Sequence, residues 1–343
     1  MSDKATGVTH ARAALLGNPS DGFGGATIAF ELPHFAAVVD ARESESILIE
    51  AYGLRLDFPD AGALVAAGRD HAYPAGGPAA LLMATAKRFC ERLADPGGDH
   101  ASIGFELRLR SSSIPPQVGL AGSSAIVIAG LRALCELFAH EIKRELLPGF
   151  ALACETEELG IAAGLQDRVV QTYGGLVFMD FDPALFKARG YGDYAQLDPE
   201  LLPPLVVAYK PDAAGDSGVA HAPMHQRFDA GEPEVVETMA TIAEFAHEGR
   251  AALQTGDRER LGSLMDRNFE LRQSIYELDP RHTAMIDAAR SVGAAANFAG
   301  SGGAVVALPA AGAPIDELRN VLAGMGGTVV VPGAPASGDR SAG

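Results

Sequence analysis

The chain has 343 residues, of which 48% are hydrophobic and 21% are charged, and its formal net charge is −17. This composition is typical of a soluble globular protein with enough apolar material for two domains. Nucleic acids and anionic membranes are disfavoured as partners because both are bound by basic patches, whereas a small anionic substrate needs only local positive charge.

No segment of the sequence has the pattern of a secretion signal or a membrane span. Residues 1–17 lack the charged and apolar regions of a signal peptide, and no apolar run approaches the ~20 residues that cross a bilayer. Cys90, Cys135 and Cys154 have no CxxC spacing and lie in helical patterns. We expect them to pack in the core of a cytoplasmic protein, with a catalytic thiol as the alternative.

The chain begins with short strand patterns separated by turn residues, which predict an antiparallel meander. The expected strands are at 8–16, 27–32, 35–41 and 46–51. A helical pattern at 76–95 and an alternating strand at 101–113 follow, and the strand leads directly to Pro115.

Helical periodicity resumes after this strand. We expect helices at 123–140, 148–159 and 165–171, and then a strand at 174–182. Residues 183–204 are weakly patterned and contain prolines, which places a domain boundary near residue 200.

The second half alternates a few strands with long amphipathic helices, a pattern that favours an α+β sandwich. Its expected elements are strands at 205–210, 294–300, 304–309 and 327–332 and helices at 232–254, 257–277, 280–291 and 315–323. We assign residues 8–200 to an N-terminal domain and 201–332 to a C-terminal domain. The low-complexity tail 333–343 is expected to be disordered.

The segment PPQVGLAGSSA, residues 115–125, has the features of an anion-binding loop. Gly119 and Gly122 let the backbone approach a phosphate, and Ser123 and Ser124 can cap the helix that follows. The free N–H groups and dipole of that helix would point at the anion. A merely well-capped helix is the alternative. The segment is neither a Walker A loop, which needs GK[ST], nor a GxGxxG dinucleotide fingerprint.

Three motifs together resemble those of the GHMP kinases, a family named for galactokinase, homoserine kinase, mevalonate kinase and phosphomevalonate kinase. They are ARAALLGNPSD near residues 12–21, the glycine-rich loop at 115–125 and FAGSGGAVVAL near 298–306. The resemblance implies an α/β fold with a ribosomal-protein-S5-like N-terminal domain, a ferredoxin-like C-terminal domain and an active site in the cleft between them. It also implies ATP and Mg²⁺ as the phosphoryl donor and its metal ion.

Within this family, GNPSD, GLQDRVVQTYGGLVFMDFD and GDSGVAHAPMHQRFDAGE are similar to segments of the glucuronokinases. The implied reaction is phosphorylation of D-glucuronate at its anomeric hydroxyl, with a sugar acid and ATP as small-molecule partners. A GHMP kinase for galacturonate, a neutral sugar or a mevalonate-like acid is one alternative. A member that binds ATP and sugar without catalysis is another.

The resemblance also implies roles for individual residues. Asp167 would act at the acceptor hydroxyl as base or orienting group, and Arg12 would supply charge to the transferred phosphoryl group. Ser124 and Glu155 would hold Mg²⁺ through hard oxygen ligands, although Glu157 and Glu158 compete with Glu155. The phosphates would contact Gly119, Leu120, Ala121, Gly122, Ser123 and Ser124.

Substrate contacts are expected from the two other motifs and from arginine. Asn18, Ser20 and Asp21 would face sugar hydroxyls, although N-P-S-D is also an ordinary turn former. Gly300, Ser301 and Gly302 would approach the substrate through their backbone. Arg168, with Arg227 as a second candidate, would bind a carboxylate, and a surface ion pair is the alternative for each. Pro223 between His221 and His225 disfavours a helical zinc site.

Overall fold

The computed structural model describes residues 3–93, 103–211 and 217–333. Residues 334–343 of the predicted disordered tail therefore lie outside the described residues. The chain divides into two compact units that interleave along the sequence. Unit 1 consists of Met1–Ala11, Phe35–Ile114 and Gly122–Thr172, and unit 2 of Arg12–His34, Pro115–Ala121 and Tyr173–Gly343. The single domain boundary near residue 200 stays a prediction.

Two long strands, β1 (Lys4–Leu16) and β2 (Ala26–Glu43), contribute residues to both units. The prediction of two separate strands at 27–32 and 35–41 was wrong, because β2 continues through both. Pro33 lies between the stretch of β2 that pairs with β6 and the stretch that pairs with β5. Its missing N–H therefore interrupts neither ladder, and one continuous strand tolerates the proline.

The sheet of unit 1 has the order β4-β3-β5-β2. Its further strands are β3 (Ile47–Ala51), β4 (Leu54–Phe58) and β5 (Phe105–Ser112). β5 lies between β2 and β3 and runs parallel to β3, so the predicted meander was wrong in placing the strands at 35–41 and 46–51 next to each other. The helices α1 and α2 lie between β4 and β5 in the chain and supply the long crossover that a parallel pair requires.

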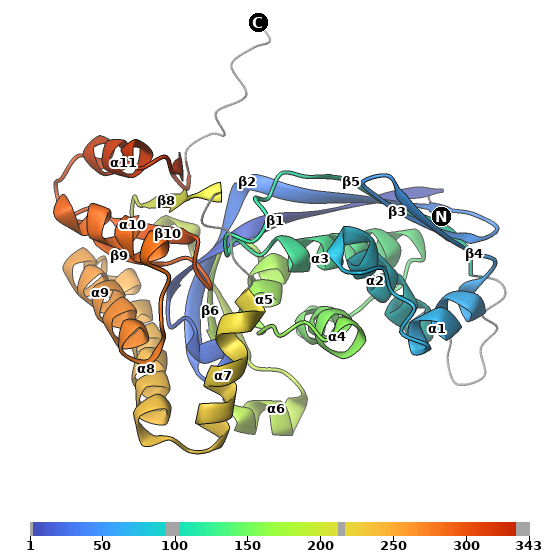
Figure 1. The fold of residues 1–343 in the computed structure, drawn as a ribbon, viewed down its shortest axis with the longest axis horizontal. Helices are drawn as coiled ribbons and strands as arrows, with labels where there is room; N and C mark the ends of the chain where they lie inside the picture. The colour runs from blue at the N-terminus through green and yellow to red at the C-terminus, as the bar shows by residue number, and fades with distance from the viewer. Residues whose placement is uncertain (1–2, 94–102, 212–216, 334–343) are drawn as a thin grey trace, which may run out of the picture. The chain divides into compact units, whose positions relative to one another are not determined.

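Five helices lie in the part of unit 1 that the structure describes, and α2 packs against α1, α3 and α4 (Figure 1). They are α1 (Ala61–Arg69), α2 (Gly77–Leu93), α3 (Gly122–Leu137), α4 (Leu147–Leu159) and α5 (Gln166–Tyr173). The last four follow the sequence predictions, whereas α1 was not predicted. Most of α3 is buried because apolar residues occur around much of its circumference.

Unit 2 contains an antiparallel sheet in the order β11-β8-β10-β9. Its strands are β8 (Val206–Tyr209), β9 (Ala295–Phe298), β10 (Ala304–Leu308) and β11 (Thr328–Val330). Two further strands, β6 (Leu176–Asp180) and β7 (Asp193–Leu197), extend the unit 2 part of β2. All but β7 were predicted.

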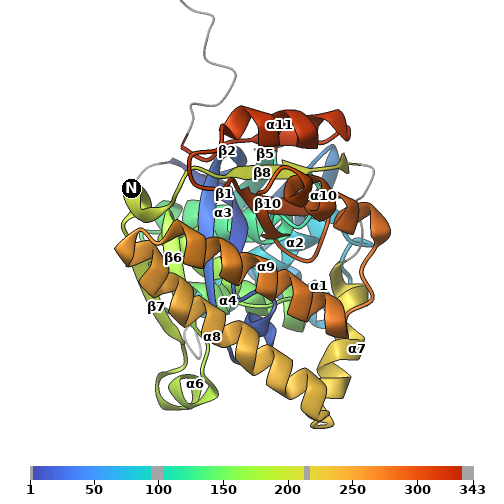
Figure 2. The ribbon, with the colours of Figure 1, turned by 90° about the vertical axis from the view of Figure 1, so that its left-hand side faces the viewer.

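Long helices cover the strands of unit 2, and Figure 2 shows α8 and α9 side by side. The helices are α6 (Pro183–Arg189), α7 (Ser217–Asp229), α8 (Pro233–Thr255), α9 (Arg258–Ile275), α10 (Pro280–Ser291) and α11 (Ile315–Gly324). α9 and α10 pack on β9, and their apolar faces share a core with α11. The helices α8 to α11 confirm the predicted periodicity, whereas α6 and α7 were missed. Pro223 lies inside α7, so this proline did not prevent a helix there.

None of the helices that the structure describes is long and apolar enough to cross a membrane.

Candidate active site

The phosphate loop at residues 115–121 and the loop of the third motif pack backbone against backbone within unit 2. Gly119 has a φ of +76°, and a Cβ at this position would lie 2.6 Å from the carbonyl oxygen of Gly302. A Cβ at Gly300 would lie 2.3 Å from the carbonyl oxygen of Gly119. Since real Cβ atoms do not approach backbone oxygens so closely, both positions require glycine. The spacing of two loops that are far apart in the sequence thus depends on the absence of side chains.

Arg12 ties these two loops together. Its Nη1 donates hydrogen bonds to the carbonyl oxygens of Gly119, at 2.7 Å, and Ala299, at 2.8 Å. The neighbouring backbone of β1 adds a bond from the Ala14 N–H to Ala299 O, at 2.8 Å. Arg12 is only 5% exposed, and these two carbonyl oxygens hold its cation beside the predicted phosphate loop.

The predicted phosphate loop offers mainly backbone groups. Leu120 and Ser124 are buried, whereas Ser123 is exposed at the start of α3. Ala121 has a φ of +63°, a conformation that is uncommon for a residue with a side chain. Such strained residues cluster at ligand-binding loops, where the surrounding structure enforces them. The strain supports the interpretation of this loop as a binding element rather than a plain helix cap.

Glu155 on α4 carries an oxygen that has no hydrogen-bond partner among the described residues. The residue is fully buried, and Arg168 on α5 donates to its Oε2 from Nε at 2.9 Å and also from Nη2. Its Oε1 is buried with no hydrogen bond. Such a buried acceptor is costly unless a cation or donor satisfies it. Hard carboxylate and hydroxyl oxygens suit Mg²⁺, so Glu155 and the buried Ser124 fit the predicted metal.

The two competing carboxylates of α4 are engaged elsewhere. Glu158 accepts from Lys87 Nζ at 2.8 Å and from the Tyr73 hydroxyl at 2.6 Å. Burial alone would raise the pKa of Glu158, but these hydrogen bonds and the nearby cations outweigh it and lower the pKa. Glu157 points away from the core and pairs with Arg88 at 2.8 Å. Among the three acids, Glu155 alone has an unpartnered buried oxygen.

Asp167 lies in the first turn of α5, where the helix dipole favours a carboxylate. Its side chain is 22% exposed, and the Arg168 Nη1 lies 3.6 Å from its Oδ2. A partly exposed carboxylate at this position can reach a small ligand. Arg168 itself is only 2% exposed, and its Nη1 also donates to the carbonyl oxygen of Gly164 at 2.7 Å. The predicted carboxylate-binding arginine is thus heavily engaged within unit 1.

The loop of the first motif is a compact turn. The Ser20 hydroxyl donates to the carbonyl oxygen of Ala26 at 3.0 Å, and Ser20 is fully buried. This geometry fits the turn interpretation of Ser20 better than a sugar contact. Asp21 is half-buried in the short 3₁₀ helix Ser20–Phe23, and Asn18 is 7% exposed.

Two residues of α9 that the sequence analysis missed hold this loop in place. Asn268 Oδ1 accepts the Gly17 N–H at 2.8 Å, and its Nδ2 donates to Asn18 O at 3.0 Å. Arg272 Nη1 donates to Asn18 Oδ1 at 2.7 Å and to Gly300 O at 2.8 Å. Burial lowers the pKa of the Arg272 guanidinium to about 10. A signal existed in the sequence: these two polar residues are four apart on the buried face of a predicted helix.

The remaining candidates have ordinary structural contacts. Arg227 pairs with Glu232 at 2.7 Å and donates to the carbonyl oxygen of Ile275. Cys90 and Cys154 are buried, and burial raises the pKa of the Cys90 thiol to about 12. Neither thiol has the depressed pKa of a nucleophile. Over the described residues, no group of three His, Cys, Asp or Glu side chains could hold a metal ion.

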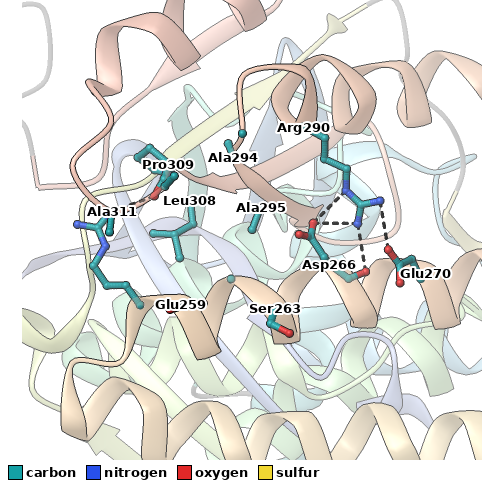
Figure 3. Close-up of a pocket in the computed structure, with 14 residues that line it drawn as sticks. Glu259, Ser263, Asp266, Glu270, Arg290, Ala294, Ala295, Leu308, Pro309 and Ala311 are labelled. Carbon is teal, nitrogen blue, oxygen red and sulfur yellow. Dashed lines mark hydrogen bonds and ion pairs between the residues drawn. The ribbon is translucent and has the colours of Figure 1, made fainter.

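A groove of about 640 Å³ in unit 2 contains none of the predicted site residues (Figure 3). It lies between α9, α10 and the end of β10. Its main ion pair joins Arg290 to Asp266, and Asp266 Oδ1 also accepts the Ala296 N–H at 3.0 Å. This pair is already satisfied within the protein, so we place the chemistry at the motif residues instead.

Comparison with known proteins points in the same direction as the motifs. Models of the GHMP kinases N terminal domain and the GHMP kinases C terminal region match residues 80–175 and 250–330. "Probable glucuronokinase 2" of Arabidopsis thaliana is 40% identical over 318 residues, covering 89% of this chain and 86% of that protein. "Glucuronokinase 1" of the same plant is 38% identical, covering 86% and 82%. Among solved structures, galactokinase of Lactococcus lactis complexed with galactose superposes with a TM-score of 0.74 at 16% identity, covering 96% of this chain and 93% of that one.

Proposed function

The chain belongs to the GHMP kinase family, and from that premise we propose that it transfers the γ-phosphoryl group of ATP to the anomeric hydroxyl of D-glucuronate. The products would be glucuronate 1-phosphate and ADP. The observation that carries this proposal is the likeness to two glucuronokinases, at 40% and 38% identity over more than four-fifths of each chain. The galactokinase likeness, at 16% identity, supports the fold alone.

The nucleotide phosphates would bind the loop Gly119–Ser124 and the N-terminal turn of α3. Leu120 has its side chain in the core, so that residue can contribute only its backbone. Backbone N–H groups at a helix N-terminus bind anions without a lysine because the helix dipole adds to their partial charge. Arg12, whose Nη1 holds both glycine loops, would place a fixed positive charge for the transferred phosphoryl group.

Ser124 and Glu155 would hold Mg²⁺ through the serine hydroxyl and the unpartnered Glu155 Oε1. When bound, the ion would neutralise charge on the phosphates. Arg168 holds the other Glu155 oxygen, Oε2, through two nitrogens and so orients the carboxylate. We propose this positioning as the main role of Arg168, ahead of a direct contact with the sugar carboxylate.

Asp167 would accept a hydrogen bond from the anomeric hydroxyl. In the transfer, the sugar oxygen forms a bond to the γ-phosphorus, and the bond from that phosphorus to the β,γ-bridging oxygen breaks. The hydroxyl proton passes to the Asp167 carboxylate or through it to solvent. Because phosphoryl transfer depends mostly on positioning and electrostatics, orientation of the oxygen is the larger part of this role.

An acceptor panel tests the proposed substrate. ADP release is measured with MgATP and D-glucuronate, D-galacturonate, D-galactose or mevalonate, and phosphorus NMR locates the new phosphate. We expect kcat/KM for D-glucuronate to exceed that for each other acceptor by at least ~10-fold, because the site would pair with groups that the others lack or misplace. Faster turnover of a neutral sugar, or a phosphate away from the anomeric oxygen, would overturn the proposal.

We also propose a cytoplasmic location. The three cysteines are free thiols, which supports a reducing compartment.

A further inference from the structure

The Asn18 side chain is held in one orientation by Arg272. Its Oδ1 accepts from the Arg272 Nη1 at 2.7 Å, which identifies the opposite atom as the amide nitrogen. Its backbone oxygen is occupied separately by Asn268. Within the described residues, Asn18 Nδ2 donates no hydrogen bond, and it is not enclosed as a buried unsatisfied atom. The loop thus presents a hydrogen-bond donor that the protein itself does not use.

Arg272 is a buried cation whose hydrogen-bond partners are all neutral. Besides Asn18 Oδ1, it donates to the carbonyl oxygens of Gly300, at 2.8 Å, and Ser301, at 3.1 Å. Its guanidinium lies over the Phe298 ring, 5.1 Å from the centroid. Among the described residues, no carboxylate lies within salt-bridge distance of it, and Asp21 acts only from longer range.

A buried charge without an ionic partner is unfavourable for stability alone, since the desolvation is not offset by a neighbouring counter-charge. The same charge attracts an anion that enters the neighbouring site, because screening is weak in a protein interior. A cation bonded to an amide oxygen also polarises the amide, which strengthens the donor at its nitrogen. Both effects favour a negatively charged or strongly accepting group beside Asn18.

We propose that Arg272 is a positioning and specificity-determining residue that fixes Asn18 as a donor and biases the acceptor site toward anionic substrates. This inference rests on the proposed function for the identity of the acceptor, a uronate, and names the chain's own residues that would recognise it. Arg272 acts through Asn18 and through its charge. It also ties the loop of the third motif to the loop of the first.

The competing interpretation is purely structural: Arg272 would only fasten two loops together. The variant Asn18→Asp distinguishes this structural interpretation from the proposed role in specificity. An aspartate still accepts from Arg272 and still suits the turn, but it replaces the free N–H donor with an anionic acceptor. We expect kcat/KM for D-glucuronate to fall by ~10²-fold or more, because a site group would be mispaired with the substrate. The KM for ATP and the thermal midpoint should stay close to wild type. Unchanged glucuronate kinetics would overturn the proposal.

Variants of Arg272 test the charge. The selectivity for D-glucuronate over D-glucuronamide, its neutral analogue, is measured for Arg272→Gln and Arg272→Lys. We expect Gln to lower this ratio at least ~10-fold and Lys to keep most of it. Arg260→Gln is the control, because Arg260 lies on the same helix in an exposed pair with Glu248. Equal losses toward both acceptors in Arg272→Gln would indicate a structural role and overturn the proposal. Asn18→Asp decides the question if Arg272→Gln does not fold.

A different acceptor in the wild-type panel would refute the proposed substrate without deciding the role of Arg272. Hydrogen exchange tests one part of that role, the ordering of the two loops, independently of the acceptor. In Arg272→Gln the amides of residues 17–21 and 300–302 should exchange faster, while those in the strand β3 should not change. The KM for whichever acceptor the wild type does use should rise. Unchanged exchange and an unchanged acceptor KM together would overturn the inference.

Discussion

Asp167 combines partial exposure with a position in the first turn of a helix, so a neutral substitute should change its chemistry more than its packing. We expect Asp167→Asn to lower kcat by at least ~10²-fold, the scale of a positioned acid–base group. The measurement is ADP release under saturating MgATP and D-glucuronate.

Asp182→Asn is a suitable control for this experiment. Asp182 caps the exposed helix α6 by accepting the Ala184 N–H at 2.7 Å, and asparagine caps equally well. Its activity should equal that of the wild type. A wild-type rate in Asp167→Asn would remove Asp167 from the mechanism.

Glu158 makes the stability of unit 1 depend on pH. The pKa of Glu158 in the folded protein lies below the ordinary glutamate value of 4.5, so its contribution to stability is fully present above that value. The contribution is lost as the pH falls through the folded-state pKa. We expect Glu158→Gln to be about 2 kcal/mol less stable than the wild type at pH 7, with the difference shrinking as the pH falls below about 4.5.

Urea denaturation of both proteins across this pH range measures the effect. Glu157→Gln is the matched control one residue earlier, because the Glu157 side chain is 64% exposed and should contribute little at any pH. A constant difference between Glu158→Gln and the wild type from pH 7 to pH 3 would contradict this explanation.

The sequence was informative about residues whose role follows from a local motif. Gly119 and Ser124 occur in a recognisable loop, and the choice of Glu155 over its neighbours agrees with their different faces of one helix. The sequence of that helix does not reveal which Glu155 oxygen lacks a partner. In the folded protein Arg168 from α5 binds Oε2, which leaves Oε1 unpartnered. The helical spacing of Asn268 and Arg272 indicates two buried polar residues, but it does not identify the partners of Arg272, which are some 250 and 30 residues away.

At the scale of elements, the two glycine loops of unit 2 depend on each other's backbone. Gly119→Ala should lower the free energy of unfolding more than Gly312→Ala does, although the two glycines have similar backbone angles. The φ of Gly119 is +76° and that of Gly312 is +79°. Gly312 has no atom within 4 Å of a built Cβ, so its alanine variant pays only conformational strain of about 1–2 kcal/mol. At Gly119 the Gly302 carbonyl oxygen must also move.

Thermal denaturation and the KM for ATP together test this comparison. Gly312→Ala should keep the wild-type KM for ATP, whereas Gly119→Ala should raise it several-fold because the phosphate loop is displaced. Equal midpoints and equal KM values for the two variants would show that the contact between the loops is unimportant.

Helices were predicted well because their periodicity is local and long, as in α8 and α9. Strand pairing was predicted less well. The parallel register of β3 with β5 and the continuity of β2 through Pro33 depend on which neighbours each strand finds. The same limit applies to α7, where Pro223 is accommodated inside the helix.

At the scale of the whole molecule, a net charge of −17 should make stability depend on ionic strength. Like charges repel one another more in the compact state than in the unfolded chain, and salt screens this repulsion. We expect the thermal midpoint to rise by a few degrees from about 10 mM to about 0.15 M NaCl. Potassium chloride at equal concentrations should act alike, and a falling midpoint would show that attractive ion pairs dominate instead.

The interleaving of the two units has a consequence for synthesis on the ribosome. Unit 1 has its last segment once residue 172 is made, so it can begin to fold while the rest is still being translated. Unit 2 includes Arg12–His34, which emerges early, yet Arg12 finds its acceptor at Ala299 only near the end of translation. Residues 12–34 therefore cannot complete their contacts in unit 2 until most of the chain has been synthesised. Premature termination before residue 299 would therefore leave Arg12 without its acceptor at Ala299, even though the phosphate loop is complete.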